Sequence, residues 1–345
     1  MKSIPVRKVL PLLLMVLCML YVSPIRAQNV RTAAGIDPPA FQRTAQTGFQ
    51  FLHLPTTARS AAMAGIHMAS GDATAAFSNP ANLTAIDNLD LAVSHISYIA
   101  DIQYNTGAIA KNMGVWGVVG VRVASLDAGE MVRTENVLDN VANTTSRSAD
   151  LGTFTAGNLL VGVTYARSIT DRLAVGGNVS YVREKLAETE VNNLSIDFGV
   201  YFETGFRSLR LALVAKNIGP DAEYVGFTEV FGIPQSVRMP IDFRFSMAYD
   251  FLDGEGTPGQ SRLTGYLEGV HPNDGPERVH AAVEYEVLGM FAARGGYRMN
   301  YDEQGLTAGA GVNFSTMGFN GRFDYAYVDY GRLSYTHILT LGIGI

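Results

Sequence analysis

The feature that most constrains this chain is a strict two-residue period in its long C-terminal part. The segment 239–251 shows it best: its odd positions, from Met239 to Phe251, are all apolar or aromatic, and its even positions include Asp242, Arg244 and Asp250. Successive side chains of a β-strand point to opposite faces. The pattern therefore predicts a strand with one apolar face and one polar face.

The same period recurs to the end of the chain and predicts an all-β fold. In 318–330, for example, Phe319 and Phe323 alternate with Arg322 and Asp324. We expect about fourteen antiparallel strands, each roughly 9–13 residues long, as in bacterial outer-membrane barrels. They lie near 89–99, 102–111, 115–126, 154–168, 173–184, 195–206, 209–216, 239–251, 262–270, 278–287, 290–300, 305–315, 318–330 and 332–345.

The connections between these strands favour a barrel with two unlike ends. Short turns alternate with longer loops near 127–153, 185–193, 218–238, 271–277 and 300–304. Outer-membrane barrels have short periplasmic turns and long extracellular loops. An even number of strands places both ends of the barrel on the short-turn side, and we expect the N-terminal segment to enter from that side.

The charged residues within strands favour a membrane barrel over the alternative, a pair of soluble β-sandwiches. We expect Asp242, Arg244, Asp250, Arg322 and Asp324 to face a water-filled lumen. We expect Phe243, Phe245, Phe319 and Phe323 to face lipid. Downstream of the N-terminus no run of about 18 apolar residues occurs, which argues against spanning helices.

Residues 1–27 have the form of a secretory signal peptide. Lys2, Arg7 and Lys8 precede an apolar stretch, and a small residue, Ala27, ends the segment. Cys18 is the only cysteine and lies inside it, so the mature chain would hold no disulfide. The net charge is −6 before the signal's basic residues are removed, which argues against a nucleic-acid partner.

Between the signal and the strands we expect two segments. Residues 28–47 are polar and aperiodic and predict a flexible N-terminal lead, whereas 48–88 predict a hatch or plug inside the barrel, which comprises residues 89–345. A short helix should run between Thr56 and Gly65, with a Thr at its start and Gly65 at its end. Asn79 and Pro80 should fix the hatch, because Asn bonds backbone at turns and Pro is rigid.

Two phrases in this region carry a family resemblance. They are Phe51-Leu52-His53-Leu54-Pro55-Thr56-Thr57-Ala58-Arg59-Ser60-Ala61-Ala62-Met63-Ala64-Gly65 and Ala75-Ala76-Phe77-Ser78-Asn79-Pro80-Ala81-Asn82-Leu83. Together they resemble the start of PorV/PorQ-type outer-membrane proteins, relatives of the FadL fatty-acid channels. The chain departs from the pattern at Ala64, where paired glycines are common, and at its final Ile345 in place of an aromatic residue.

The resemblance implies a 14-stranded antiparallel transmembrane β-barrel, FadL-like, with a short N-terminal helical hatch. Its hatch motif is Arg59, Gly65, Asn79, Pro80 and Ala81. It further implies the outer membrane of a Gram-negative bacterium and service as an accessory or shuttle in type IX protein secretion. The partners would be outer-membrane lipid, the type IX translocon and cargo proteins with C-terminal signal domains.

Three functions stay open: the secretion accessory, a FadL-like channel for uptake of hydrophobic small molecules, and a general porin. A fatty-acid channel would need an apolar patch in its lumen, whereas the lumen faces here look mostly polar. A porin would need a long constriction loop, for which 127–153 and 218–238 could serve, and a secretion accessory needs only loops and a plug. The six histidines lack the spacing of a zinc site, and no G-x-S-x-G or dinucleotide-binding phrase occurs. We therefore expect no catalytic residues, no metal and no cofactor, and we predict that the chain is not an enzyme.

Overall fold

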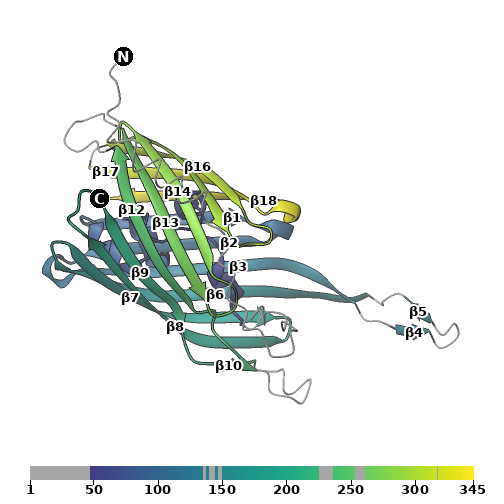
Figure 1. Cartoon of the computed structure of the whole chain (residues 1–345). Coiled ribbons are helices and arrows are strands. Elements are labelled where there is room, and N and C mark those ends of the chain that lie inside the picture. The colour runs from purple at the N-terminus through teal and green to yellow at the C-terminus, as the bar shows by residue number, and fades with distance from the viewer. Residues whose placement is uncertain are drawn as a thin grey trace, which may run out of the picture.

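The structure is a computed structural model of the whole chain, shown in Figure 1. It describes residues 47–345 except 135–136, 140–143, 147–149, 225–235, 253–260 and 317. The expected signal peptide and most of the expected lead lie outside the described residues.

Fourteen strands form one closed antiparallel barrel. Each expected strand is present, with somewhat different bounds. The closing pair is β1 with β18, in register from Asp90 opposite Gly344 to Ser97 opposite His337. The barrel strands are β1 (Leu89–Ser97), β2 (Gln103–Asn112), β3 (Val118–Thr134), β6 (Asp150–Thr170), β7 (Leu173–Leu186), β8 (Thr189–Glu203), β9 (Arg210–Ile218), β12 (Asp242–Leu252), β13 (Arg262–Pro272), β14 (Arg278–Val287), β15 (Phe291–Met299), β16 (Leu306–Thr316), β17 (Phe319–Asp329) and β18 (Tyr335–Gly344).

In the barrel, the two-residue period of the sequence corresponds to side chains that point alternately into the lumen and outward. Along β1, buried and exposed positions alternate strictly. Paired residues on neighbouring strands share a face, so the outward apolar side chains line up in rows across the barrel. One such row crosses seven strands: Ile343, Leu91, Ile109, Val121, Val163, Val179 and Ile196, all at least 36% exposed.

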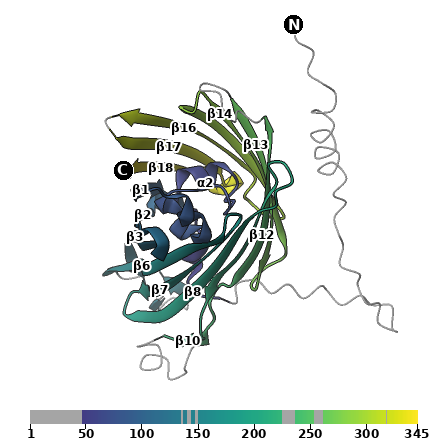
Figure 2. The same ribbon diagram turned by 90° about the vertical axis from the view of Figure 1, so that its left-hand side faces the viewer.

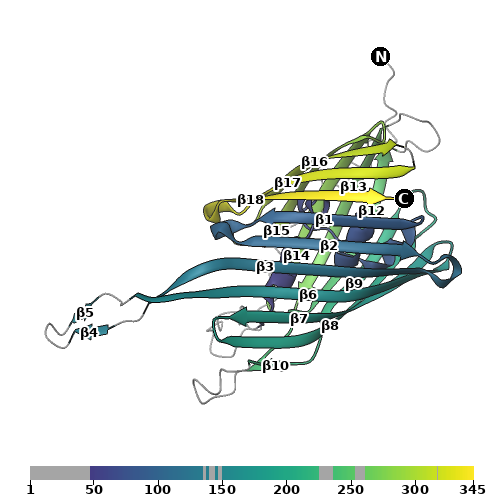
Figure 3. The same ribbon diagram turned by 180° about the vertical axis from the view of Figure 1, so that it is seen from behind.

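One end of the barrel carries longer structures than the other. On the long-loop end, β3 and β6 pair far beyond their neighbours and lead to a small hairpin of β4 (Val137–Asp139) and β5 (Thr144–Ser146), which projects from the barrel in Figures 1 and 3. The expected loop 185–193 is wrong, because β7 and β8 continue to a tight turn at 187–188. Because polar residues occupy both faces of these strand ends, the two-residue alternation is not visible there, although β7 and β8 remain paired up to Leu186 and Thr189. A further pair, β10 (Ala222–Glu223) and β11 (Ser236–Val237), lies between β9 and β12.

The hatch, residues 48–88, fills the inside of the barrel, as the end-on view in Figure 2 shows. It consists of η1 (Gln50–His53), α2 (Ala58–Ala62), η2 (Ala73–Phe77) and η3 (Pro80–Ala85). Helix α2 packs on β15–β18, η2 on β1–β3 and η3 on β6–β8. Outside the barrel lumen, η4 (Ile99–Asp101), η5 (Gly114–Trp116) and η6 (Gly331–Leu333) lie in connections between strands. None of the helices in the described part of the chain is long and apolar enough to cross a membrane.

The hatch enters the barrel from the opposite end to the one the sequence suggested. Thr47 bridges to Arg238, which lies in the connection before β12 at the long-loop end. At its other end the hatch passes into β1 beside the C-terminus, where Leu89 N donates to Ile345 O at 3.3 Å. The sequence indicated only that the strands begin and end on one side. It held no information on where a hatch of short turns starts.

Candidate functional site

Glycines line the inner face of the barrel wall where the hatch contacts it, and their lack of a side chain leaves space for the hatch backbone. A Cβ added to Gly199 would lie 2.0 Å from Asn79 Oδ1, and one added to Gly176 would lie 2.6 Å from Ala81 N. These two glycines are paired across β7 and β8. On the other side of the lumen, Gly309 would place a Cβ 2.5 Å from that of Ala62. Only glycine lets two backbones approach this closely, so the wall is shaped for this hatch.

The Asn79-Pro80-Ala81 phrase of the hatch motif forms the helix start that seats on this glycine pair. Asn79 is fully buried, caps η3 by accepting from Ala81 N at 3.1 Å, and donates from Nδ2 to Val200 O of β8 at 3.1 Å. Pro80 is the first residue of η3, where its missing N–H costs nothing. One side chain thus both begins a helix and binds it to the wall.

Arg59 and Gly65, the other two members of the hatch motif, lie at the two ends of α2. Thr57 caps α2 by accepting from Ser60 N at 3.3 Å. Arg59 follows and pairs with Glu284 of β14 at 2.9 Å. After the helix, Gly65 has a positive φ, and its N–H donates to Ser60 O at 2.8 Å. This hydrogen bond satisfies a carbonyl group at the C-terminal end of the helix. It requires a left-handed backbone at position 65, which glycine adopts easily.

The carbonyl end of η2 is bound by long side chains of the wall. Arg122 and Asn178 both donate to Ala76 O, at 2.8 and 3.0 Å, and Lys216 donates to Phe77 O at 2.7 Å. Arg122 and Asn178 also bind Asp197, at 2.7 and 2.9 Å. Buried helix ends need such partners. The sequence analysis singled out none of these residues, because a charge on a strand's polar face does not reveal which hatch carbonyl it meets.

A second polar network lies between β12–β14 and the hatch. Arg244 joins two carboxylates, Asp242 at 2.7 Å and Glu268 at 3.0 Å. Glu268 is fully buried and also accepts from His67 N of the hatch at 2.8 Å. Burial, with Arg244 and Lys216 nearby, lowers the pKa of His67 to about 4. The imidazole is therefore neutral at pH 7 and can accept from Lys216 Nζ at 3.3 Å.

The expectation that the lumen charges face enclosed water is wrong for three of them. Asp242, Arg244 and Asp324 do lie on the inner face, but they are 2%, 9% and 6% exposed and are covered by partners and by the hatch. Asp324 pairs with Arg294. The remaining two are half-buried: Arg322 binds Asp90 at 2.7 Å and Asp250 pairs with Arg210. The hatch and the paired side chains of the wall thus cover most of the surface of these charged groups.

Two large cavities lie in the described part of the lumen, one on each side of the hatch. The outer cavity, at the long-loop end, has a volume of about 730 Å³. Its apolar walls include Leu52, Leu54, Phe77, Tyr98, Tyr330 and Leu333, and its polar walls include His53, His67, Lys216, Arg244, Arg278 and His280. Within these side chains, Arg244 Nε and Arg278 Nε are buried away from the cavity, and His280 Nδ1 lies 3.7 Å from a carboxylate oxygen of Glu268.

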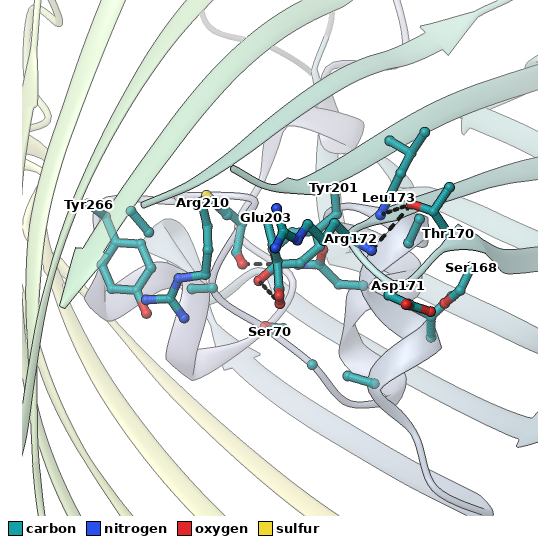
Figure 4. Close-up of a pocket in the computed structure, with 18 of the residues that line it drawn as sticks. Ser70, Ser168, Thr170, Asp171, Arg172, Leu173, Tyr201, Glu203, Arg210 and Tyr266 are labelled. Atoms are coloured by element: carbon teal, nitrogen blue, oxygen red, sulfur yellow. Dashed lines mark hydrogen bonds between the residues drawn. The ribbon is translucent and has the colours of Figure 1, made fainter. Parts of the chain in front are cut away.

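The inner cavity, at the short-turn end, has a volume of about 450 Å³ and is shown in Figure 4. Tyr201, Glu203, Arg210 and Tyr266 of the wall face hatch residues there, among them Ser70. Tyr201 donates to Glu203 at 3.4 Å, so the phenol and the carboxylate form one polar edge of the space. Met68, Leu173, Ala174 and Ala248 contribute apolar surface.

The hatch separates the two cavities, and its segment Gly65–Gly71, which we call the septum, borders both of them. Gly65 and His67 line the outer cavity, whereas Met68 to Gly71 line the inner one. In its backbone, His67 N donates to Glu268, Met68 O accepts from Asn82 Nδ2 at 2.9 Å and Ile66 O from Ser60 Oγ at 3.3 Å, and Gly65 N and Ile66 N donate back to Ser60 O and Met63 O. The His67 ring also contacts Lys216 at 3.3 Å and Arg244 at 3.2 Å. Glycine at both ends gives the backbone freedom to turn.

The four predicted lipid-facing phenylalanines lie on the outside of the barrel. Phe243, Phe245, Phe319 and Phe323 are 41–54% exposed. Phe243 and Phe245 border an apolar groove of about 570 Å³ on the outer surface over Gly269. Exposed apolar residues surround the barrel, as expected for a wall that meets hydrocarbon. Within the described residues no cluster of His, Cys, Asp and Glu could hold a metal ion.

Comparison with known proteins identifies the fold. No protein-family model matches the chain, and no curated protein matches it either. Among solved structures, the CymD monoaromatic hydrocarbon channel has 13% identity and a TM-score of 0.52, with 84% of this chain and 96% of that chain covered. The Ralstonia pickettii toluene transporter TbuX has 14% identity and a TM-score of 0.53, and the Pseudomonas putida toluene transporter TodX has 11% identity and a TM-score of 0.53. Each covers 84% of this chain and 97% of its own.

These likenesses confirm the expected architecture. The chain is a closed 14-stranded antiparallel β-barrel with a short helical hatch at its N-terminus, and it shares its fold with these channels and transporters.

Proposed function

We propose that this barrel is a channel that takes up hydrophobic small molecules across the outer membrane. The observation that carries the proposal is the presence of two lumen cavities of about 730 and 450 Å³, one on each side of the hatch, with the septum between them. Sites for small molecules are concave, largely apolar and of this size. A ligand would rest in the outer cavity until the septum moves, and then pass to the inner one.

The walls of the outer cavity indicate which molecules would bind. Leu52, Leu54, Phe77 and Tyr330 suit an apolar body. The basic side chains of Lys216, Arg244 and Arg278 on its polar wall suit a hydrogen-bond acceptor at one end of it, because their N–H groups can donate to it. We therefore propose a mainly apolar ligand that carries an acceptor group.

The comparisons support this function over the others. The three similar structures are channels or transporters for toluene and related monoaromatic hydrocarbons by their names. The role as a type IX secretion accessory, with a translocon and cargo as partners, rests on the two N-terminal phrases 51–65 and 75–83. It stays the second candidate. That the chain is not an enzyme remains a prediction.

A reversible lock on the septum tests the channel. A Cβ built on Gly71 lies 3.3 Å from Ala85 Cβ of η3. This separation is close to the spacing of a disulfide. We expect the double variant Gly71→Cys/Ala85→Cys to lose most uptake of radiolabelled 1-decanol by whole cells when oxidised, and to regain it with reductant. The two single-cysteine variants are the controls, since the mature chain has no other cysteine.

The same assay separates the candidates. Toluene has no acceptor group, so its uptake should be slower than that of 1-decanol. Equal decanol uptake by locked, reduced and deleted strains would refute the channel. Loss of surface-anchored proteins in the deletion strain, found by surface proteomics, would then favour the secretion accessory.

A further inference from the structure

One histidine of the septum lies between two cations of the barrel wall. The Nε2 atom of His67 lies 3.3 Å from Lys216 Nζ of β9, and its Nδ1 atom lies 3.2 Å from Arg244 Nη1 of β12. Nδ1 also lies 2.8 Å from Gly65 O, which can only accept a hydrogen bond. The neutral ring therefore carries its proton on Nδ1, and Nε2 remains as the acceptor for Lys216.

The two cations cannot move away from this ring without losing bonds of their own. Lys216 Nζ also donates to Phe77 O at 2.7 Å. Arg244 is held between two carboxylates, Asp242 at 2.7 Å and Glu268 at 3.0 Å. The ring, by contrast, belongs to the septum, which has a glycine at each end and therefore a backbone that can turn. Repulsion at this point would be relieved by movement of the septum.

One carboxylate opposes the two cations at the ring. Glu268 Oε1 of β13 lies 3.5 Å from His67 Nδ1. This carboxylate already accepts from Arg244 Nη1 at 3.0 Å and from His67 N at 2.8 Å, and the ring of His280 on β14 lies 3.7 Å from it. Burial, followed by the charges of Arg244 and Lys216, outweighs Glu268 and lowers the pKa of His67 to about 4.

The direction of the pH effect follows from this lowered pKa. Once the septum has moved away from the two cations, the His67 ring regains its ordinary pKa of 6.5. A group whose pKa is lower in the closed state binds protons preferentially in the open state. The closed state therefore keeps its full advantage above about pH 6.5 and loses it as the pH falls toward 4. The ratio of open to closed septum should rise about tenfold from pH 7.5 to pH 5.5.

We propose that His67 is a proton-operated latch on the passage between the two cavities. When its ring takes up a proton, Lys216 and Arg244 repel it, and the septum moves away from the wall. The latch rests on the proposed channel function, because it regulates the passage through which the ligand would move. Uptake through the barrel would then be faster in acidic surroundings.

Single-channel conductance in planar bilayers at pH 7.5 and 5.5 tests the latch. We expect the open fraction of the wild type to be about tenfold greater at pH 5.5. His67→Gln keeps a hydrogen-bonding side chain and gains no charge, so it should stay closed at both pH values. His67→Lys carries a charge at both and should be open at both. His337→Gln removes an exposed histidine from the outward face of β18 and should respond to pH like the wild type.

Equal open fractions of the wild type at the two pH values would overturn the latch. So would acid opening that persists in His67→Gln, or opening of that variant at pH 7.5, since the loss of the ring rather than its charge would then free the septum. Heat-modifiable gel mobility at both pH values checks that each barrel is intact. Conductance that ignores pH, together with normal uptake of 1-decanol, would refute the latch alone, whereas the disulfide lock on the septum tests the channel itself.

Discussion

Replacing Gly199 with Ala should dislodge the hatch while leaving the barrel closed. The added methyl would lie 2.0 Å from Asn79 Oδ1 and 2.9 Å from Pro80 Cδ. Carbon and oxygen cannot approach so closely, and Asn79 is fully buried with both ends of its amide engaged. The β8 backbone cannot retreat, since it is paired to β7 and β9 on either side. The hatch must therefore give way.

The cost can be worked from these contacts. Loss of the Asn79 cap on η3 costs roughly 1 kcal/mol. Loss of its bond to Val200 O costs about 1 kcal/mol, and residual overpacking adds about 1 kcal/mol or more. The total of about 3 kcal/mol corresponds to about a 100-fold change in the ratio of seated to displaced hatch. The strand itself should not suffer, because Ala is no worse than Gly there.

Single-channel conductance in planar bilayers measures the displaced hatch directly. We expect Gly199→Ala to show long open events that the wild type shows rarely. Gly269→Ala is the matched control: it is also a wall glycine, but it faces outward, and nothing lies within 4 Å of its added Cβ. Both variants should keep heat-modifiable gel mobility. Equal, closed behaviour of the two variants would refute the idea that the wall glycines seat the hatch.

Two further variants test the lumen and the lipid face. Glu268→Gln removes the charge that Arg244 and the hatch share at this buried carboxylate, and should lower stability by about 3 kcal/mol. Thermal unfolding followed by circular dichroism checks this, with the pair of Glu303 and the exposed Arg332 as control: Glu303→Gln should leave the unfolding midpoint near that of the wild type, because an ion pair in contact with water contributes little. An unchanged midpoint for Glu268→Gln would contradict the network. Phe245→Arg should lower the stability of the barrel in the membrane by roughly 2 kcal/mol, because it puts a charge on the lipid-facing side. The amount of folded, heat-modifiable protein in the membrane fraction should therefore fall for Phe245→Arg and not for Phe245→Leu. Equal amounts of folded protein for the two variants would contradict the assignment of the outward face.

The barrel could be predicted from the sequence because its physics is local. The alternation from Met239 to Phe251 shows which face of the strand is apolar. A strand with this period can bury its apolar side chains only by turning that one face away from water. All fourteen strands were placed in this way. The pattern fails where both faces are polar: β3, β6, β7 and β8 are longer than the sequence predicts, and their ends fall within the predicted loops 127–153 and 185–193.

The site could be predicted only in part, because it depends on contacts between distant segments. The Asn79-Pro80 phrase pointed to a fixed turn, since its chemistry is local. The glycine pair of Gly176 and Gly199 and the reach of Arg122 to the hatch became visible only with the strands in register. The burial of the charged lumen residues could not be predicted either. It depends on how closely the hatch packs against the wall, and the alanines and glycines of the hatch do not indicate this in the sequence.

The central claim is that the outward face of this barrel meets hydrocarbon, and fluorescence quenching tests it most directly. Trp116 is the only tryptophan and lies 74% exposed in the turn after β2. In a Trp116→Phe background, Val163→Trp places a single indole on the outward face in the middle of β6. In liposomes, lipids brominated in mid-chain should quench it strongly and dissolved acrylamide weakly, whereas native Trp116 should show the reverse preference. Strong acrylamide quenching with no effect of brominated lipid at position 163 would contradict the account.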